Sequence, residues 1–568
     1  MWQIERFTKS PSEQNALLLW GVVAIVAFQF MLGLYAVALN ALFYAHYGPF
    51  FDSLSYDDVL ANMELNAQSD GTVAALSGEI YRSTVVYPWV LFAPFARFAI
   101  ASRAVGVWIQ IFAAAWMQLA IFLYFLKVRG RTWAEAFAYS TVFVLIVAVF
   151  DSNGGLPDFR MDLLQYFLFT TVMANYLIVR RFRALGWWAL LGLTTGLLCL
   201  GRATSPVYIV PIFGVCALVD LIADRKNHRQ VLIRWLLAGS VAAVVAGWFF
   251  VSNYNYLHSY YFVWNPDANA RLPLSESVVH LRFALDHVGT TLLVILTLTA
   301  LLTYASFARE HGTVAERQLN WRPLLFSAVP LGYLVISGSG LNPFVSIVGV
   351  SGVMLFLLDP IDAAQTSLPR PISVLVVGAL LVAGLLNAAA GIALNTRDVA
   401  AWIPRQDGIR EVVQTITNAV AQSGQPRRFR YACLYTAELS QGGIFNTMFF
   451  DQHIPFIKGP TAIIAGSKLA AFGLTTDLSV GSPRVAGATD EELVDGIIQS
   501  AAKNVDFLVT SDSGTQMPTQ VNINRLVTEI NRRLMESREW EQVAGPITIS
   551  PTEKAIVLRN RKRTGDSE

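Results

Sequence analysis

The sequence contains little charge and little cysteine. Only 14% of its 568 residues are charged, 42 Lys and Arg nearly balance 40 Asp and Glu, and there are three cysteines. A near-neutral balance gives no electrostatic footprint for nucleic acid, and three cysteines are too few for a disulfide framework. With 54% hydrophobic residues and a mean hydropathy of +0.46, the composition also excludes an ordinary soluble enzyme, a disordered chain and a fibrous repeat. The chain is therefore expected in a membrane.

Long apolar runs recur along the first two thirds of the chain. A bilayer core of roughly 30 Å needs about 20 mostly apolar residues per helix, and only segments whose backbone groups are paired internally cross it. The sequence predicts eleven such spans, at about 16–43, 104–126, 134–150, 161–179, 186–201, 206–223, 232–252, 289–307, 323–340, 343–358 and 373–394. The first run is too long for the core of a signal peptide, so it is expected to remain as an anchor.

Basic residues in the short loops indicate the orientation of these spans. Basic residues precede the first span, and clusters at 127–131, 180–183 and 225–229 fall on the same side if the N-terminus is cytoplasmic. An odd number of spans then places the C-terminus in the periplasm. The apolar run 84–101 contains two prolines and an arginine. As a span it would invert every later loop, so we expect one or two helices lying in the outer interface instead.

After about residue 396 charged residues become frequent, which marks a second domain. The chain is expected to divide into a transmembrane domain at 1–396 and a small periplasmic α/β domain at 397–568. The predicted elements of the second domain are a helix at 407–423, strands at 430–435 and 505–510, a helix at 521–538 and a hairpin of 546–550 with 554–558. This part has no G-x-G-x-x-G and no P-loop, so nothing in it indicates nucleotide chemistry.

Ionisable side chains are scarce along the middle of the predicted spans and gather at their predicted outer ends. A proton- or ion-coupled transporter normally carries carboxylates or broken helices at mid-depth. The outer charges include Asp52 after the first span, Asp158, Arg160 and Asp162 before the fourth, and Arg202 after the fifth. This distribution favours chemistry at the outer surface on a substrate that is anchored in lipid.

Carboxylates and arginines beside a membrane surface suit the transfer of a sugar from a lipid phosphate. A carboxylate can take the proton of an attacking hydroxyl, which typically accelerates a reaction about 10²- to 10⁴-fold. Arginine holds the departing phosphate in a bidentate manner, and a divalent cation held by carboxylates could share that charge.

Three segments carry a resemblance to a known family. Phe51-Asp52-Ser53-Leu54-Ser55-Tyr56 has an Asp followed by an aromatic residue, Asp158–Leu164 opens a span with two carboxylates, and Gly196–Thr204 is a glycine-containing run that ends in Arg202 and Thr204. These segments and the layout of the spans resemble the GT-C membrane glycosyltransferases, in particular the bacterial aminoarabinose transferase and the protein O-mannosyltransferases. Ser53 replaces the Glu of the family's first loop. The resemblance implies Asp52 as the catalytic base, a polyprenyl-phosphate sugar as the donor and the bacterial inner membrane as the location.

The other candidate residues carry alternatives. Asp158 and Asp162 share a helix face and are candidates for catalysis or, for Asp162 with His258, for a metal site, whereas capping of the fourth span explains the two carboxylates equally. Arg202 could contact a phosphate or extend to the outer interface. Further candidates for substrate binding are Arg82, Arg160, Tyr56, Tyr260 and Tyr261. An interfacial aromatic belt also explains the last two, and a lone histidine is more often structural.

We therefore expect a polytopic α-helical membrane protein that transfers one sugar from a polyprenyl-phosphate donor to an envelope lipid, glycan or protein. The mechanism expected is direct displacement with inversion, and a divalent metal ion is the one cofactor considered. The expected partners include membrane lipids and exclude nucleic acid. Two other functions stay open: a flippase or transporter of lipid-linked sugars, and a non-catalytic membrane subunit whose outer domain binds partners.

Overall fold

The chain forms two compact units. A computed structural model describes residues 11–46, 56, 59–60, 63–64, 66–81, 83–98, 102–151, 154–158, 161–182, 184–259, 278–311, 320–337, 343–364, 369–422, 431–433, 490–511, 521–550 and 553–564. The first unit consists of 1–40, 66–257 and 269–396, and the second of 41–65, 258–268 and 397–568.

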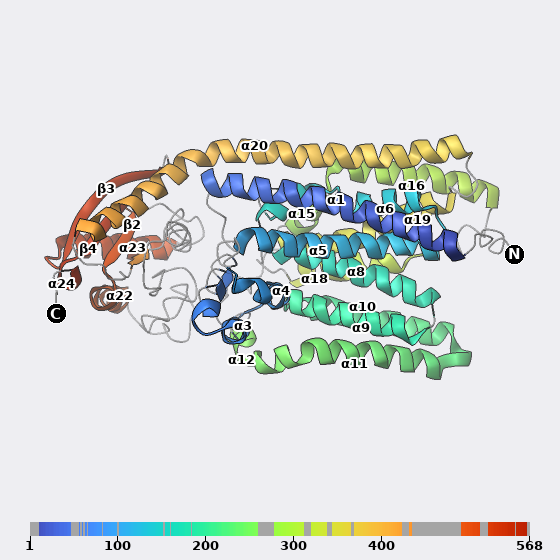
Figure 1. The fold of residues 1–568 in the computed structure, drawn as a ribbon, viewed down its shortest axis with the longest axis horizontal. Helices are drawn as coiled ribbons and strands as arrows, with labels where there is room; N and C mark the ends of the chain where they lie inside the picture. The colour runs from blue at the N-terminus through green and yellow to red at the C-terminus, as the bar shows by residue number, and fades with distance from the viewer. Residues whose placement is uncertain are drawn as a thin grey trace. The chain divides into compact units, whose positions relative to one another are not determined.

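The first unit is a bundle of helices (Figure 1). Its elements, including three (α1, α12 and α20) whose ends belong to the second unit, are α1 (Pro11–His46), α3 (Thr72–Ile80), α4 (Tyr87–Ala96), α5 (Ser102–Leu123), η2 (Tyr124–Val128), α6 (Trp133–Val142), α7 (Val147–Phe150), η3 (Leu156–Asp158), α8 (Met161–Arg181), α9 (Leu185–Gly201), α10 (Ser205–Ala223), η4 (Arg225–Asn227), α11 (His228–Ser252), α12 (Tyr254–His258), α15 (Val279–Val288), α16 (Thr290–His311), α18 (Arg322–Ser337), η6 (Pro343–Gly349), α19 (Val350–Ala364) and α20 (Arg370–Gln422). Helix α8 is the innermost, because its whole apolar window is buried and it packs between α5 and α9.

Within the described part of the chain, seven helices are long and apolar enough to cross a membrane. An eighth is reached if α15 and α16, which meet at an angle of 87°, are counted as one broken span. Leu185–Gly201 and Arg322–Ile336 are shorter apolar helices. These helices agree with a multi-pass membrane protein, while the expected number of eleven spans is not confirmed.

Two of the expected apolar segments differ in shape from a simple span. The expectation of one helix over 134–150 is wrong, because α6 ends at Val142 and α7 begins only at Val147, after Ile146 in an extended conformation. The run 84–101 yields α4, with Pro88 in its first turn and Pro94 inside it. Ten residues are about half of what a span needs, so α4 cannot cross the bilayer.

The second unit contains a four-stranded sheet of order β1-β2-β4-β3. Its strands are β1 (Tyr431–Cys433), β2 (Phe507–Ser511), β3 (Trp540–Ser550) and β4 (Glu553–Asn560), and its other helices are α22 (Asp490–Asn504), α23 (Val521–Glu536) and α24 (Arg561–Thr564). Strand β1 pairs with β2 in parallel, whereas β4 is antiparallel to both of its neighbours. The parallel pair with an antiparallel hairpin makes this unit an α/β structure.

Apolar residues cover both faces of this sheet, because successive side chains of a strand point to opposite sides. One face buries Phe507, Val509 and Val557 against Ile409 and its helical neighbours in the C-terminal part of α20. The opposite face carries Leu508, which lies beside Leu558, and here Thr510 donates a hydrogen bond to Asn531 of α23. Helices therefore flank the sheet on both sides.

Candidate functional site

Asp162 and Arg202 form an ion pair at one end of the helical bundle. Helix α9 ends at Gly201, and Arg202 follows in an extended conformation beside the first turn of α8, which contains Asp162. The Arg202 guanidinium lies 2.9 Å from Asp162 Oδ1, and the two side chains are 15% and 2% exposed. A carboxylate in the first turn of a helix is also favoured by the helix dipole. The pair holds a positive group at the end of the bundle in a fixed position.

Two backbone hydrogen bonds fix the chain around Arg202. The Val86 amide donates to the Leu200 carbonyl (2.7 Å), and the Ala203 amide donates to the Thr84 carbonyl (3.1 Å). A Cβ at Gly201 would lie 2.7 Å from a methyl group of Leu168, so a larger residue at 201 would have to displace the end of that side chain. The segment that precedes α4 is thus tied to the end of α9.

Gln165 lies one turn further along α8 and extends the polar cluster. Its Nε2 donates to Ser205 Oγ at 2.8 Å and to Thr204 Oγ1 at 3.4 Å. Its Oε1 is buried without a hydrogen-bond partner among the described residues. Asp162, Gln165, Arg202, Thr204 and Ser205 therefore make a polar group where α8, α9 and α10 meet.

Asp158 stabilises the loop that leads into α8. Its Oδ2 accepts a hydrogen bond of 2.7 Å from the Gly154 amide, and Gly154 has a φ of 96°, in the left-handed region that favours glycine. The Asp158 side chain is buried. Asn40, near the end of α1, donates to the Pro157 carbonyl at 2.5 Å. Asp158 thus holds a loop that also contacts α1, and this bond is not the helix cap that was the alternative for the residue, because Gly154 precedes α8.

The structure describes only some of the remaining predicted residues. Outside the described residues lie Asp52, Arg82, Arg160, Tyr260 and Tyr261, so their roles stay predictions. Tyr56 is half-buried and belongs to the second unit, as does His258, the last residue of α12. Of the nine residues proposed for catalysis or substrate binding, the structure brings together Asp162 and Arg202 in direct contact, while Asp158 ends η3, just before α8.

The described residues around Asp162 contain no cluster of metal ligands. A divalent cation usually takes several oxygen or nitrogen ligands, and no group of three or more His, Cys, Asp and Glu side chains converges in the part of the chain that the structure describes. Asp162 is already paired with Arg202. A metal ion held by Asp162 and His258, which belong to different units, stays a prediction.

A second polar contact within the first unit was not expected from the sequence. Asp151 Oδ2 lies 3.7 Å from His287 Nε2, and both side chains are largely buried. His287 also stacks on Phe283, with ring centroids 3.7 Å apart. Asp151 and His287 are far apart in the sequence and form no recognisable motif. The same is true of Gln165 with Ser205, so sequence spacing alone could not have paired them.

Known structures share this architecture. ArnT from Cupriavidus metallidurans in the apo state aligns with a TM-score of 0.58 and 11% identity, over 96% of this chain and 99% of ArnT. The chain has the GT-C fold. The same ArnT bound to undecaprenyl phosphate aligns with a TM-score of 0.55, 11% identity and the same coverage. The oligosaccharyltransferase AglB from Archaeoglobus fulgidus, in complex with an inhibitory peptide and a dolichol-phosphate, aligns over 90% of this chain and 72% of AglB at 11% identity and a TM-score of 0.48.

At the level of sequence the comparisons find no counterpart. No family model and no curated protein matches the chain. The fold prediction made from the three short segments and the layout of the spans is nevertheless confirmed by structure.

Proposed function

We propose that the chain is a membrane glycosyltransferase that moves a sugar from a polyprenyl-phosphate donor to an acceptor in the bacterial cell envelope. The observation that carries the proposal is the full-length similarity to ArnT, which has been solved with undecaprenyl phosphate bound. The Asp162–Arg202 pair adds a fixed guanidinium at one end of the bundle. We place this end at the periplasmic face of the inner membrane, with the N-terminus in the cytoplasm.

In the proposed reaction an acceptor oxygen attacks the anomeric carbon of the sugar. The new bond forms on the face opposite the leaving group as the bond from the anomeric carbon to the phosphate oxygen breaks, so the configuration inverts. Asp52 takes the acceptor proton, and the electron pair of the broken bond leaves on the polyprenyl phosphate. Arg202 stabilises this charge through charge-assisted hydrogen bonds, and Asp162 positions Arg202.

The contacts of Asp158 and Asp162 support different roles for the two carboxylates. Asp162 contacts Arg202 directly, so a neutral Asn should leave the guanidinium in place but less constrained. Asp158 binds a backbone amide of its own loop, so its loss should reduce folding more than turnover. These roles separate positioning from proton transfer, which we assign to Asp52.

The proposal is tested by release of the carrier lipid, which any sugar donor of this type must produce. The purified full-length chain would be incubated with a panel of polyprenyl-phosphate sugars and a detergent extract of bacterial envelopes, and free polyprenyl phosphate would be measured by mass spectrometry. We expect release by the wild type, none by Asp52→Asn, and about 100-fold slower release by Arg202→Gln. Arg97→Gln, a change of an exposed arginine at the end of α4, should act like the wild type.

Three results would contradict the proposal or part of it. Transfer at the wild-type rate by Asp52→Asn would remove that residue from the mechanism. Equal losses in Arg202→Gln and Arg97→Gln would remove the special role of Arg202. Movement of lipid-linked sugar across proteoliposomes without release of polyprenyl phosphate would favour a transporter.

A further inference from the structure

Three helix ends meet around Asp220. Arg180 lies in the last turn of α8, Asp220 in the last turn of α10, and Arg322 is the first residue of α18. Arg180 Nε and an Arg322 guanidinium nitrogen each lie 3.3 Å from Asp220 Oδ1, while the Tyr176 hydroxyl donates to Asp220 Oδ2 at 3.4 Å. We call these four residues the Asp220 cluster.

The Asp220 cluster contains one more positive charge than negative charge. Two guanidiniums share a single carboxylate, and both carboxylate oxygens already accept contacts. A guanidinium has five N–H donors, so most donors of the two arginines are not used by Asp220. Arg322 Nε has no hydrogen-bond partner among the described residues. The cluster therefore has both the charge and the donors to bind one further anion.

A neighbouring group of charged residues shows that this excess is specific. Arg129 and Arg131 contact Asp359 and Asp362, so two cations meet two anions there. Asn320 joins the two groups, because its amide donates to Asp359 Oδ2 and its side-chain oxygen accepts from the Arg322 amide. At the same end of the bundle, one group is balanced and the Asp220 cluster is not.

Aromatic rings prevent the arginines from withdrawing into the bundle. Tyr176 packs against Phe213, Trp235 and Phe326, with ring centroids 5.8 to 6.1 Å apart. These rings fill the space between the helices beneath Asp220, and Tyr176 is itself part of the cluster. The guanidiniums are therefore held at the helix ends, where polar groups of a bilayer lie.

The start of α18 adds to the positive potential. The N-terminus of a helix carries unpaired amides and a partial positive charge, which favour an anion. Helix α18 has 16 residues, and its first residue is one of the two arginines. Trp321, which precedes it, is partly exposed and lies beside the Arg322 guanidinium, 5.4 Å from ring centroid to Cζ. An indole next to a cation is typical of the head-group region.

We propose that Arg180 and Arg322 bind the phosphate of one anionic phospholipid head group, with its acyl chains lying along α10 and α18. A phosphodiester monoanion matches the excess of one positive charge, and two guanidiniums match its oxygens. Basic pockets between spanning helices are a recognised kind of head-group site. This site is separate from the Asp162–Arg202 pair, and the inference does not depend on the proposed transferase activity.

The test measures lipid retention by the purified full-length protein. Native mass spectrometry in a non-ionic detergent would titrate phosphatidylglycerol, phosphatidylcholine and phosphatidylethanolamine separately. We expect tight retention of one phosphatidylglycerol and weak binding of the two zwitterionic lipids. Arg180→Gln and Arg322→Gln should each weaken phosphatidylglycerol binding about fivefold, the equivalent of about 1 kcal/mol per basic residue near the membrane surface. Arg181→Gln, which neutralises the next residue of α8, is the matched control and should have no effect.

Asp220→Asn distinguishes a lipid site from a purely structural ion pair. Removing this carboxylate leaves two uncompensated guanidiniums, so phosphatidylglycerol should bind about fivefold more tightly and should raise the melting temperature of the variant more than that of the wild type. A structural pair would lose stability without any gain in lipid affinity. Arg322→Lys keeps the charge and should retain most of the binding, so it replaces Arg322→Gln if that variant does not fold.

Other outcomes would overturn the inference. Equal binding of phosphatidylglycerol and phosphatidylcholine would show that no anion is selected. An equal loss in Arg181→Gln would indicate diffuse surface charge rather than this cluster. Displacement of phosphatidylglycerol by millimolar inorganic phosphate would assign the arginines to a free anion instead of a lipid.

Discussion

Substitution of Gly192 gives a direct measure of how closely α9 and α11 pack. A Cβ at this position would lie 2.4 Å from the Ala238 carbonyl oxygen and 2.8 Å from Val241 Cβ, so the backbone of α11 would have to move. Alanine gains about 1 kcal/mol over glycine in a helix interior, whereas overpacking costs about 1–3 kcal/mol. At Gly214 on α10 nothing lies within 4 Å, so there only the gain remains. We expect Gly192→Ala to be about 1–3 kcal/mol less stable than Gly214→Ala.

The assay is thermal unfolding of both purified variants and the wild type in the same detergent. Gly214→Ala should melt at or above the wild type and Gly192→Ala below it. Gly196→Ala should also melt below Gly214→Ala, because a Cβ there would lie 2.6 Å from Val245 Cβ, which moves only with the backbone of α11. Since α9 ends next to Arg202, carrier-lipid release should fall in Gly192→Ala as well. If Gly192→Ala melted with Gly214→Ala, the close approach of α9 and α11 would be refuted.

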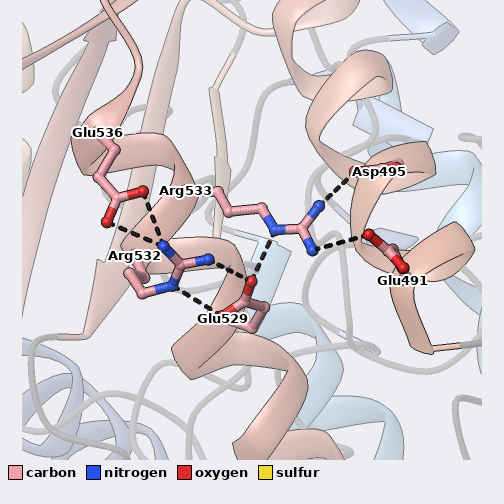
Figure 2. A network of polar contacts seen from close by, with 6 residues as sticks. All are labelled: Glu491, Asp495, Glu529, Arg532, Arg533 and Glu536. Carbon is pink, nitrogen blue, oxygen red and sulfur yellow. Dashed lines mark hydrogen bonds and ion pairs between the residues drawn. The ribbon is translucent and has the colours of Figure 1, made fainter.

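Two further predictions concern charged groups. Asp362→Asn leaves the buried Arg131 without its carboxylate partner, which should cost about 3–5 kcal/mol. Thermal unfolding checks this, with Lys127→Gln, a change of a half-buried lysine, as the control. Equal melting of the two variants would contradict the prediction. In the second unit, hydrogen bonds from Arg532 and Arg533 lower the pKa of Glu529 to about 2 (Figure 2). The stability that Glu529 contributes is therefore present above its unfolded pKa of roughly 4.3 and is lost as the pH falls toward 2. Pepsin cleavage within 521–536 should therefore accelerate over this range in the wild type and in Glu536→Gln but not in Glu529→Gln, and parallel profiles for all three would show that Glu529 is not responsible.

Local patterns predicted many elements because those elements depend on local rules. The apolar run at 161–179 became α8 (Met161–Arg181), and the alternating segment 554–558 lies inside β4 (Glu553–Asn560). The break inside 134–150 was missed, although one boundary was readable. Thr132 and Glu135 form a capping box that marks the start of α6. Nothing in the sequence signals the extended conformation of Ile146, which follows from packing.

The candidate site was predictable only residue by residue. Arg202 was a candidate for phosphate binding because it lies in a short turn after a predicted span. Asp162 was a candidate for catalysis because it lies at the acidic start of the fourth predicted span, which forms α8. Their pairing depends on how α8 and α9 pack, which a single sequence does not reveal. Asp158 shows the limit of prediction from sequence. A carboxylate that precedes a helix is equally compatible with catalysis and with helix capping, and the structure shows instead a local hydrogen bond from the Gly154 amide. Asp362 with Arg131 was missed for the same reason, since 231 residues separate them.

The elbow between α15 and α16 constrains how this protein can change during evolution. Gly289 has a φ of 94°, and a Cβ there would collide with the Asn387 side chain, whose Nδ2 donates 2.8 Å to the Val288 carbonyl that the bend leaves unpaired. A larger residue at 289 would displace the Asn387 amide. An apolar residue at 387 would leave the Val288 carbonyl without a hydrogen-bond donor in an apolar environment. Positions 289 and 387 should therefore vary together in homologues, and a straight α15–α16 helix should occur only where both have been replaced.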